Sequence, residues 1–201
     1  GVFVTPNLVA AVAGLAPTMV AAQPKASATA ADPIGDYCSA RGGSRPIRKI
    51  LIANNGMAAT KSILSMRQWA YMELGDEKLI EFVAMATPED LNANAEFIRL
   101  ADSFVEVPAG GNKNNYANVD LIIKTAVENG VDAVWPGWGH ASENPALPNG
   151  LDKAGIKFIG PRGPIMYALG DKIAANILAQ TAGVSFQPRA PNCSVFSATS
   201  I

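Results

Sequence analysis

The feature that most constrains the fold is a regular alternation of short apolar runs and amphipathic stretches, which begins at Ile47. Five runs have the length and composition of buried strands, namely IRKILIA, LIEFVAMA, SFVEVP, VDAVWP and IKFIG. Segments with helical spacing of apolar residues lie between them. Strands and helices that alternate in this way predict an α/β fold, in which a parallel sheet is flanked by helices on both faces.

The helical segment after the first strand covers residues 54–73. One face of it gathers the apolar side chains, which are Ala59, Ile63, Met66 and Ala70. Lys61 and Arg67 fall outside this set and are predicted to lie on the solvated face. Asn54 and Asn55, at the start of the segment, are expected to cap its free N–H groups.

Two further helices are marked by their ends. Thr87 is predicted to be an N-cap, because Pro88 and two acidic residues follow it in the first turn. The next helix is predicted over residues 118–129 and is closed by Gly130. Its apolar stripe consists of Val119, Ile122, Ile123, Ala126 and Val127.

Composition excludes several classes of protein. With 201 residues, 49% of them hydrophobic and 16% charged, the chain suits one folded domain with extra segments. A net charge of −1 gives no broad attraction to nucleic acid or anionic membranes. No apolar run reaches the roughly 18 residues of a membrane-spanning helix. Cys38 and Cys193 lie far apart and indicate neither a metal site nor a disulfide framework, which fits a reducing compartment.

The amino-terminal segment differs from the rest. Residues 1–31 hold no acidic residue, a single basic residue, and much Ala, Ser and Thr. This composition resembles an organelle transit segment, although such segments are normally more basic, and a disordered extension is the alternative. We expect residues 1–44 to be disordered, and because the chain begins with Gly1 rather than Met, we expect its true start to be missing or removed.

Two loops stand where a parallel sheet collects ligands, beyond the carboxyl ends of the first and fourth strands. The first, ANNGMAA, supplies one glycine, and no acid stands at the expected place after the second strand, so it is not a dinucleotide-binding fingerprint. The second, WPGWGHASEN, places two of the three Trp and the single His of the chain within six residues. Bulky side chains beside flexible glycines in a loop indicate a functional role.

Longer stretches resemble a known family. They are KILIANNGMAATKSI, ATPEDLNANAEFIRLAD, VPAGGNKNNYANVDLI, AVWPGWGHASENPALP and FIGPRGPIMYALGDKIAANILAQTAGV. In this order they resemble the N-terminal part of the biotin carboxylase domain of eukaryotic multidomain acetyl-CoA carboxylases, from about Asp36 to Val184. The resemblance implies a Rossmann-like, pre-ATP-grasp domain. The wider family usually has Ala-Asn-Arg-Gly and His-Pro-Gly-Tyr-Gly in the two loops, so Asn55, Trp135 and Trp138 resemble the eukaryotic acetyl-CoA enzymes.

The resemblance also implies a chemistry. Biotin carboxylases use ATP and Mg²⁺ to activate bicarbonate and carboxylate biotin, and a second half-reaction gives malonyl-CoA for fatty acid synthesis. The implied partners are the ATP-grasp, biotin carrier and carboxyltransferase domains of a parent enzyme that forms homo-oligomers, with acetyl-CoA as a further substrate. The implied location is the cytoplasm or a plastid.

The resemblance assigns ligand contacts to four residues of this chain. Lys172 matches a lysine that contacts the ATP phosphates, although a solvated lysine at a helix start, where the dipole disfavours a cation, is the alternative. Trp138, Gly139 and Glu143 match the loop on the biotin side. A plug at a domain interface is the alternative for Trp138, and Glu143 is expected to accept hydrogen bonds within the loop. His140 is expected to be a hydrogen-bonded loop residue rather than a general base.

The resemblance divides the chain into three parts: an extension (1–44), the biotin carboxylase N-terminal domain (45–168) and the start of an ATP-grasp region (169–201). The tail SFQPRAPNCSVFSATSI departs from the family pattern. We therefore expect a fragment, a truncated gene product or a splice variant that is inactive alone, with no catalytic residue and no metal site assigned to it. The alternative is a non-catalytic α/β binding or regulatory module derived from a carboxylase.

Overall fold

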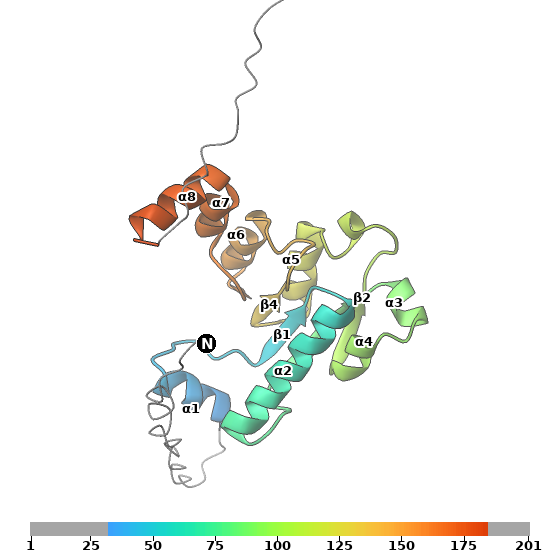
Figure 1. Ribbon diagram of the computed structural model, residues 1–201. Coiled ribbons are helices and arrows are strands. Elements are labelled where there is room, and N and C mark those ends of the chain that lie inside the picture. The colour runs from blue at the N-terminus through green and yellow to red at the C-terminus, as the bar shows by residue number, and fades with distance from the viewer. Residues whose placement is uncertain (1–31, 185–201) are drawn as a thin grey trace, which may run out of the picture. The chain divides into compact units, whose positions relative to one another are not determined.

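The computed structural model describes residues 32–184, which contain one parallel sheet of five strands (Figure 1). The strands are β1 (Lys49–Ile52), β2 (Glu81–Ala86), β3 (Ser103–Glu106), β4 (Ala133–Trp135) and β5 (Lys157–Phe158). The helices are α1 (Pro33–Ala40), α2 (Gly56–Leu74), α3 (Pro88–Asn92), α4 (Glu96–Leu100), α5 (Val119–Glu128), α6 (Ala146–Lys153), α7 (Gly163–Gly170) and α8 (Lys172–Thr181), with a 3₁₀ turn, η2 (Asn112–Asn114). The predicted α/β class is confirmed.

The strand order is β3-β2-β1-β4-β5, and all pairs are parallel. The chain moves outward from β1 through β2 to β3 and then returns to place β4 on the other side of β1. The register pairs Ile52 with Trp135, the last residues of the two central strands. The loops that follow β1 and β4 therefore begin side by side, at the point where the direction of winding reverses.

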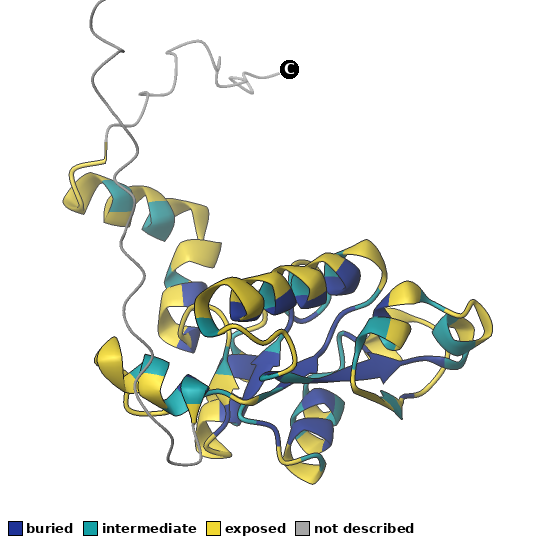
Figure 2. Ribbon diagram, turned by 90° about the horizontal axis from the view of Figure 1, so that it is seen from below, coloured by how far each residue is buried: buried dark blue, intermediate teal, exposed yellow. Residues whose placement is uncertain are grey.

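Alternate residues of the strands enter two separate cores, because successive side chains of a strand point to opposite faces. On one face the sheet packs against α5 and α6, through residues such as Leu51, Val83, Ile122 and Leu151. On the other it packs against α2 and α4, through residues such as Ile52, Phe82, Ile63 and Phe97. Figure 2 shows the buried sheet between helices whose outer sides are exposed.

The predicted apolar face of α2 is largely confirmed, since Ala59, Ile63 and Ala70 are buried and Met66 is partly buried. The prediction for Arg67 is wrong. This residue is 6% exposed, and its guanidinium donates to the carbonyl oxygens of Glu77 and Leu100 and to both carboxylate oxygens of Asp102. Helical periodicity places Arg67 next to the apolar face, and its polar partners, Glu77, Leu100 and Asp102, lie outside α2.

Asp102, which is partly exposed, is the acceptor in this ion pair. Burial by itself raises the pKa of its carboxyl group, but the Phe82 N–H, the Arg67 guanidinium and Lys78 together hold the pKa below its usual value. The Asp102 carboxylate is bound to α2 through Arg67 and to the first part of β2 through Phe82. The pair therefore fastens the helix to the edge of the sheet opposite the ligand-collecting loops.

The segment that begins at Thr87 is confirmed as a helix start, with one difference in length. Thr87 and Asp90 form a reciprocal capping box, and Pro88 occupies the first turn. The expected single helix is divided into α3 and α4, and Asn94 between them has a φ of 48°. Asn tolerates the left-handed conformation better than most residues, which allows the break.

The stripe predicted on α5 is also confirmed in part. Ile122 and Ala126 are fully buried, and Val119 and Ile123 pack against them. Val127, however, is 54% exposed and does not belong to the buried face. The backbone turns at Gly130, whose φ is 59°.

The start of the fold lies earlier than predicted, because Pro33–Ala40, placed in a disordered extension, form α1. Asp32 caps this helix by accepting a hydrogen bond from the Gly35 N–H and pairs with Arg48. Ile34 enters the core on the α2 side. Predictions for residues 1–31 and for the tail 185–201, including Cys193, lie outside the described residues. The domain boundary predicted at residue 168 falls within α7 and stays a prediction.

None of the helices formed by residues 32–184 combines the length and the apolar character needed to cross a membrane.

Candidate functional site

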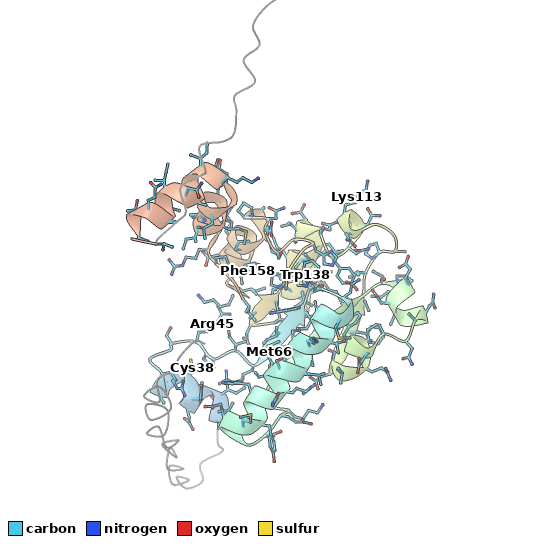
Figure 3. The ribbon with its side chains drawn as sticks, in the orientation of Figure 1. Cys38, Arg45, Met66, Lys113, Trp138 and Phe158 are labelled. Carbon is cyan, nitrogen blue, oxygen red and sulfur yellow. The ribbon has the colours of Figure 1, made fainter. Side chains whose placement is uncertain are left out.

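The loops after β1 and β4 line an open cavity of about 680 Å³ at the carboxyl edge of the sheet. Figure 3 labels Trp138 in this region and Lys113 on the neighbouring η2 turn. The cavity combines the first turn of α2 with the Trp138 loop, defined as residues 136–140, and with one residue of η2. Its lining consists of Asn54, Asn55, Gly56, Met57, Ala58, Lys61, Asn112, Trp138, Gly139 and His140.

Asn54 joins the two loops. Its side chain is buried, and its amide nitrogen donates to the carbonyl oxygens of Pro136 (2.6 Å) and Trp138 (3.0 Å). The Asn54 side-chain oxygen, Oδ1, accepts a hydrogen bond from the Asn55 N–H at 2.8 Å. Asn55 is the N-cap of α2 by position but makes no side-chain capping bond. The predicted capping role is therefore wrong for both residues, because the Asn54 amide is used across the sheet.

Trp138 and Gly139 form the exposed part of the Trp138 loop. The Trp138 side chain is 79% exposed, so the described residues leave most of its indole surface uncovered. Gly139 has a φ of 69°, and no heavy atom lies within 4 Å of the position that a Cβ would take. The exposed Trp138 ring and the accessible backbone of Gly139 thus lie next to each other in the cavity lining.

Gly137 is required for the turn itself. Its φ is 66°, and a Cβ built there would lie 2.7 Å from the Asn54 amide nitrogen and 2.6 Å from the Trp135 ring. Real side chains do not approach so closely, and positive φ is rare for residues other than glycine. The backbone at Gly137 therefore wraps tightly around the Asn54 side chain.

His140 lies at the inner end of the loop. Its backbone has a φ of 49°, and its ring centroid is 5.5 Å from that of Tyr116. Burial lowers the pKa of the imidazole, which favours the neutral form. Among the described residues its side chain makes no hydrogen bond, so the structure replaces the expected hydrogen bond by a ring contact. A neutral, ring-packed imidazole is a structural part of the loop.

Sequence reasoning missed Tyr116, whose ring packs against that of His140. Tyr116 is 1% exposed, and its hydroxyl donates to the Asp90 carboxylate at 2.6 Å and lies 3.1 Å from the Met85 carbonyl oxygen. Burial, followed by the bond to Asp90, raises the pKa of Tyr116 far above its usual value. The available signal was an aromatic residue in the polar stretch NNYAN, which is unusual in a solvated loop.

The two other predicted contacts lie away from this cavity lining. Glu143 is exposed, and within residues 32–184 no hydrogen bond to its carboxylate is formed, so its expected role as an acceptor is not observed. Lys172 is the first residue of α8 and is exposed. Asp171 caps α8 by accepting the N–H groups of Ile173 and Ala174, at 2.7 and 2.9 Å. The structure thus groups Trp138 with Gly139 and separates both from Lys172.

Metal binding finds no support in the part of the chain that the structure describes. Residues 32–184 hold no group of three or more His, Cys, Asp or Glu side chains placed to bind an ion. The polar groups of the cavity are amides, one lysine, the His140 imidazole and backbone, a set that includes donors suited to a neutral or anionic organic group.

Comparison with known proteins gives a consistent set of relatives. Residues 46–166 match the family described as biotin carboxylase, N-terminal domain. Acetyl-CoA carboxylase 2 of Arabidopsis thaliana is 59% identical over 155 residues, which are 77% of this chain and 7% of the plant protein. The acetyl-CoA carboxylase of Saccharomyces cerevisiae is 58% identical over 158 residues, which are 78% of this chain and 7% of the yeast protein.

Solved structures agree with these relatives. The biotin carboxylase domain of a thermophilic 2-oxoglutarate carboxylase, bound to bicarbonate, has a TM-score of 0.60 at 27% identity and covers 69% of this chain and 28% of that chain. A complete multifunctional pyruvate carboxylase from Rhizobium etli has a TM-score of 0.57 at 37% identity and covers 70% of this chain and 13% of that chain. The chain spans about 7% of the length of the acetyl-CoA carboxylases that it matches. With more than half of its residues matched in sequence and the fold matched in space, the chain belongs to the biotin carboxylase N-terminal domain family.

Proposed function

We propose that this chain is the N-terminal segment of the biotin carboxylase component of an acetyl-CoA carboxylase, called the parent carboxylase below. The parent carboxylase would carboxylate biotin with ATP and bicarbonate and supply malonyl-CoA for fatty acid synthesis. The observation that carries the proposal is the 58–59% identity to plant and yeast acetyl-CoA carboxylases over more than three quarters of the chain. ATP, biotin and Mg²⁺ would be the ligands of the parent carboxylase, and its further domains the partners of this segment.

The contribution of this segment is a wall for biotin. Biotin has an apolar bicyclic body with a polar urea edge, and it accepts the carboxyl group at a urea nitrogen. The exposed indole of Trp138 supplies an apolar face, and Gly139 allows a ring to approach the backbone. A cavity of about 680 Å³ beside them is large enough for such a group. The residues therefore fit biotin by shape and by donor chemistry.

ATP would be held mainly by other parts of the parent carboxylase. Phosphoryl transfer needs several cations and metal ligands around the transferring group. Lys172 is the phosphate contact that we propose within this chain. Its exposed position at the start of α8, outside the Trp138 cavity, supports a nucleotide contact separate from the biotin wall. The described residues do not fit a Mg²⁺ site, so we assign the metal to no residue of this chain.

Two single substitutions in the parent carboxylase test this division. Trp138→Ala should raise the half-saturating concentration of free biotin by about tenfold or more, the usual effect of removing a buried aromatic contact, at saturating ATP. Lys172→Ala should raise the half-saturating concentration of ATP and leave the dependence on biotin near that of the wild type. If Trp138→Ala changes the dependence on ATP instead, the loop has been assigned to the wrong ligand. If it lowers thermal stability alone, Trp138 is an interface plug.

Isolated from the parent, the 201-residue chain should show no bicarbonate-dependent ATP hydrolysis and no carboxylation of free biotin, because it provides one wall and one phosphate contact. Turnover above that of a Lys172→Ala control would contradict this.

A transcript that continues in frame past Val184 into a Gly-rich loop would support the parent carboxylase over a separate binding module. Fusing residues 1–44 to a fluorescent protein would decide between the two proposed locations, plastid and cytoplasm, and the mass of the purified parent carboxylase would test its proposed homo-oligomeric state.

A further inference from the structure

We infer that Asn54 is a positioning residue for the Trp138 loop, which it holds in the conformation that presents Trp138 and Gly139 to the ligand. This inference rests on the proposed function of the loop as a biotin wall. Asn54 is 2% exposed, and both hydrogens of its amide are used by carbonyl oxygens of this one loop, at 2.6 and 3.0 Å. The hydrogen bond from the Ala53 N–H to the Trp135 carbonyl oxygen (2.9 Å) continues the strand pairing up to this point.

The two hydrogen bonds fix the orientation of two peptide planes. In a trans peptide the C=O and N–H groups point in opposite directions. Because the Trp138 carbonyl oxygen is held against the Asn54 amide, the N–H of Gly139 must point away from that buried side chain. Within the described part of the chain this N–H donates to no acceptor. Asn54 thus turns a backbone donor outward, beside the exposed Trp138 ring.

Besides the Asn54 amide, the loop is held by the Ser142 N–H, which donates to the Gly139 carbonyl oxygen at 2.9 Å, and by the contact between the His140 and Tyr116 rings. The turn at Gly137 has positive φ and fits closely around the Asn54 side chain, with 2.7 Å between its built Cβ and the Asn54 amide nitrogen. In Asn54→Asp, a carboxylate oxygen replaces the amide nitrogen and faces two carbonyl oxygens at hydrogen-bond distance. Like partial charges repel, and one buried and one partly buried carbonyl oxygen lose their donor, so the loop must move or the carboxylate must be protonated.

The chain contains a matched residue for comparison, Asn115. It is 1% exposed, its amide nitrogen donates to the carbonyl oxygens of Pro108 and Gly110 (both 3.0 Å), and its carbonyl oxygen accepts the next N–H, that of Tyr116, at 2.7 Å. Asn54 has the same pattern with Pro136, Trp138 and the N–H of Asn55. Asn115→Asp therefore imposes the same chemical change on a different loop, the one that follows β3.

The first experiment uses the 201-residue chain and measures amide hydrogen–deuterium exchange with thermal unfolding. Asn54→Asp should speed exchange at the Ser142 N–H, which donates to the Gly139 carbonyl oxygen of the loop, and leave residues 108–116 near the wild-type rate. Asn115→Asp should give the opposite pattern with a similar fall in Tm. If Asn54→Asp speeds exchange evenly over the sheet, Asn54 is a general stabilising residue and the inference is wrong. Should the Asp variant not fold, Asn54→Ala provides the same comparison without an added charge.

The second experiment measures steady-state kinetics of the same variants in the parent carboxylase. Misplacing a binding group by about 1 Å can cost up to a hundredfold in rate, so Asn54→Asp should raise the half-saturating concentration of biotin by about tenfold, with the ATP dependence unchanged. Asn115→Asp should leave the dependence on ATP unchanged and have a smaller effect on that of biotin, because only Asn112 of its loop lines the cavity. If Trp138→Ala weakens biotin use and Asn54→Asp does not, the positioning role is wrong while the proposed function stands. If neither variant affects biotin use, the proposed function of the loop fails first.

Discussion

The sheet with its loops and the α7–α8 segment each carry part of the proposed site, and they differ in what holds them in place. In the loops and the helix that pack on the sheet, the buried side chains of Asn54, Arg67 and Tyr116 form hydrogen bonds with partners within the chain. In α8 no residue is buried, and α7 buries only Gly163 and Met166. Their large apolar side chains are exposed, among them Ile165, Tyr167, Leu169, Ile173 and Ile177.

This difference separates the two proposed ligand contacts. The position of Trp138 follows from hydrogen bonds that the described chain supplies itself, so the proposed biotin wall would be formed before any ligand arrives. Lys172 is carried by a helix whose apolar residues have few partners among residues 32–184. Its position is therefore less fixed by this chain. We expect substitutions in the sheet to change the stability of the chain, and substitutions in α8 to change it little.

The largest effect is expected for Arg67→Met. The variant removes the guanidinium that pairs with Asp102 and leaves a partly buried carboxylate with fewer partners. Breaking a fully buried ion pair from one side typically costs about 3–5 kcal/mol, and the partial exposure of Asp102 places the expected loss at the lower end of this range. Urea unfolding of the chain should show a loss of this size. Lys61→Met is the control, because it also replaces a basic residue by methionine, on the exposed side of the same helix. It should alter the free energy of unfolding by less than about 0.5 kcal/mol.

A pair of isoleucines tests the comparison directly. Ile63 on α2 is fully buried and Ile173 on α8 is 73% exposed. Ile63→Ala should lower the free energy of unfolding by about 2–5 kcal/mol, because it removes buried methylenes and leaves a cavity. Ile173→Ala should change it by less than about 0.5 kcal/mol. Equal losses for the two variants, measured by urea unfolding, would mean that α8 is packed as firmly as the sheet.

The third effect concerns ligand approach at Gly139. Valine there would project a branched side chain into the open space beside Trp138, and a blocked contact of this kind costs about 1–3 kcal/mol, roughly ten- to a hundredfold in affinity. We expect Gly139→Val in the parent carboxylase to raise the half-saturating concentration of biotin within this range and to leave that of ATP nearly unchanged.

Gly139→Val also strains the backbone, since φ is 69° there. Gly75 provides the control for this strain: it closes α2 with a φ of 83°, and nothing lies within 4 Å of its built Cβ. Gly75→Val should lower stability to a similar degree without changing the dependence on biotin. An equal defect in biotin use from both variants would show that backbone strain, not blocked approach, is the cause.

The fold could be predicted because its signals are local. Strands β1 to β5 are short apolar runs, and Thr87 with Pro88 marks a helix start through residue types that act on neighbouring backbone. The loop of Trp138 and Gly139 could be selected because it follows a strand in a parallel sheet, whereas the two residues themselves were assigned by the family resemblance. What could not be predicted depends on partners far apart in sequence. Periodicity assigns Arg67 to the helix surface, and only the folded chain brings Asp102 to it.

The same reason explains the error at Asn54. An Asn before a helix is commonly a cap, and this local interpretation is sound until the neighbouring strand is known. Once β4 lies beside β1, two carbonyl oxygens of the Trp138 loop compete for the Asn54 amide and are the partners observed. Tyr116 was missed similarly, because its partner Asp90 lies 26 residues earlier in the chain.

The smallest effect, and the one confined to the sheet side of the comparison, is a pH dependence from His140. Burial holds the pKa of its imidazole below the usual value in the folded chain. Between that lowered pKa and the unfolded value of about 6.5, the unfolded chain binds more protons than the folded chain. The free energy of unfolding therefore rises with pH in this window and falls as the pH drops below about 6.5. His140 is the single histidine of the chain, which makes its titration easy to isolate. The free energy of unfolding, measured by urea between pH 7 and 5.5, should decline in the wild type. His140→Asn should remove this decline, and Asn is suited to the left-handed backbone at this position. If the variant declines as steeply as the wild type, protonation of His140 is not opposed by the fold, and its ring contact with Tyr116 does not shield it from water.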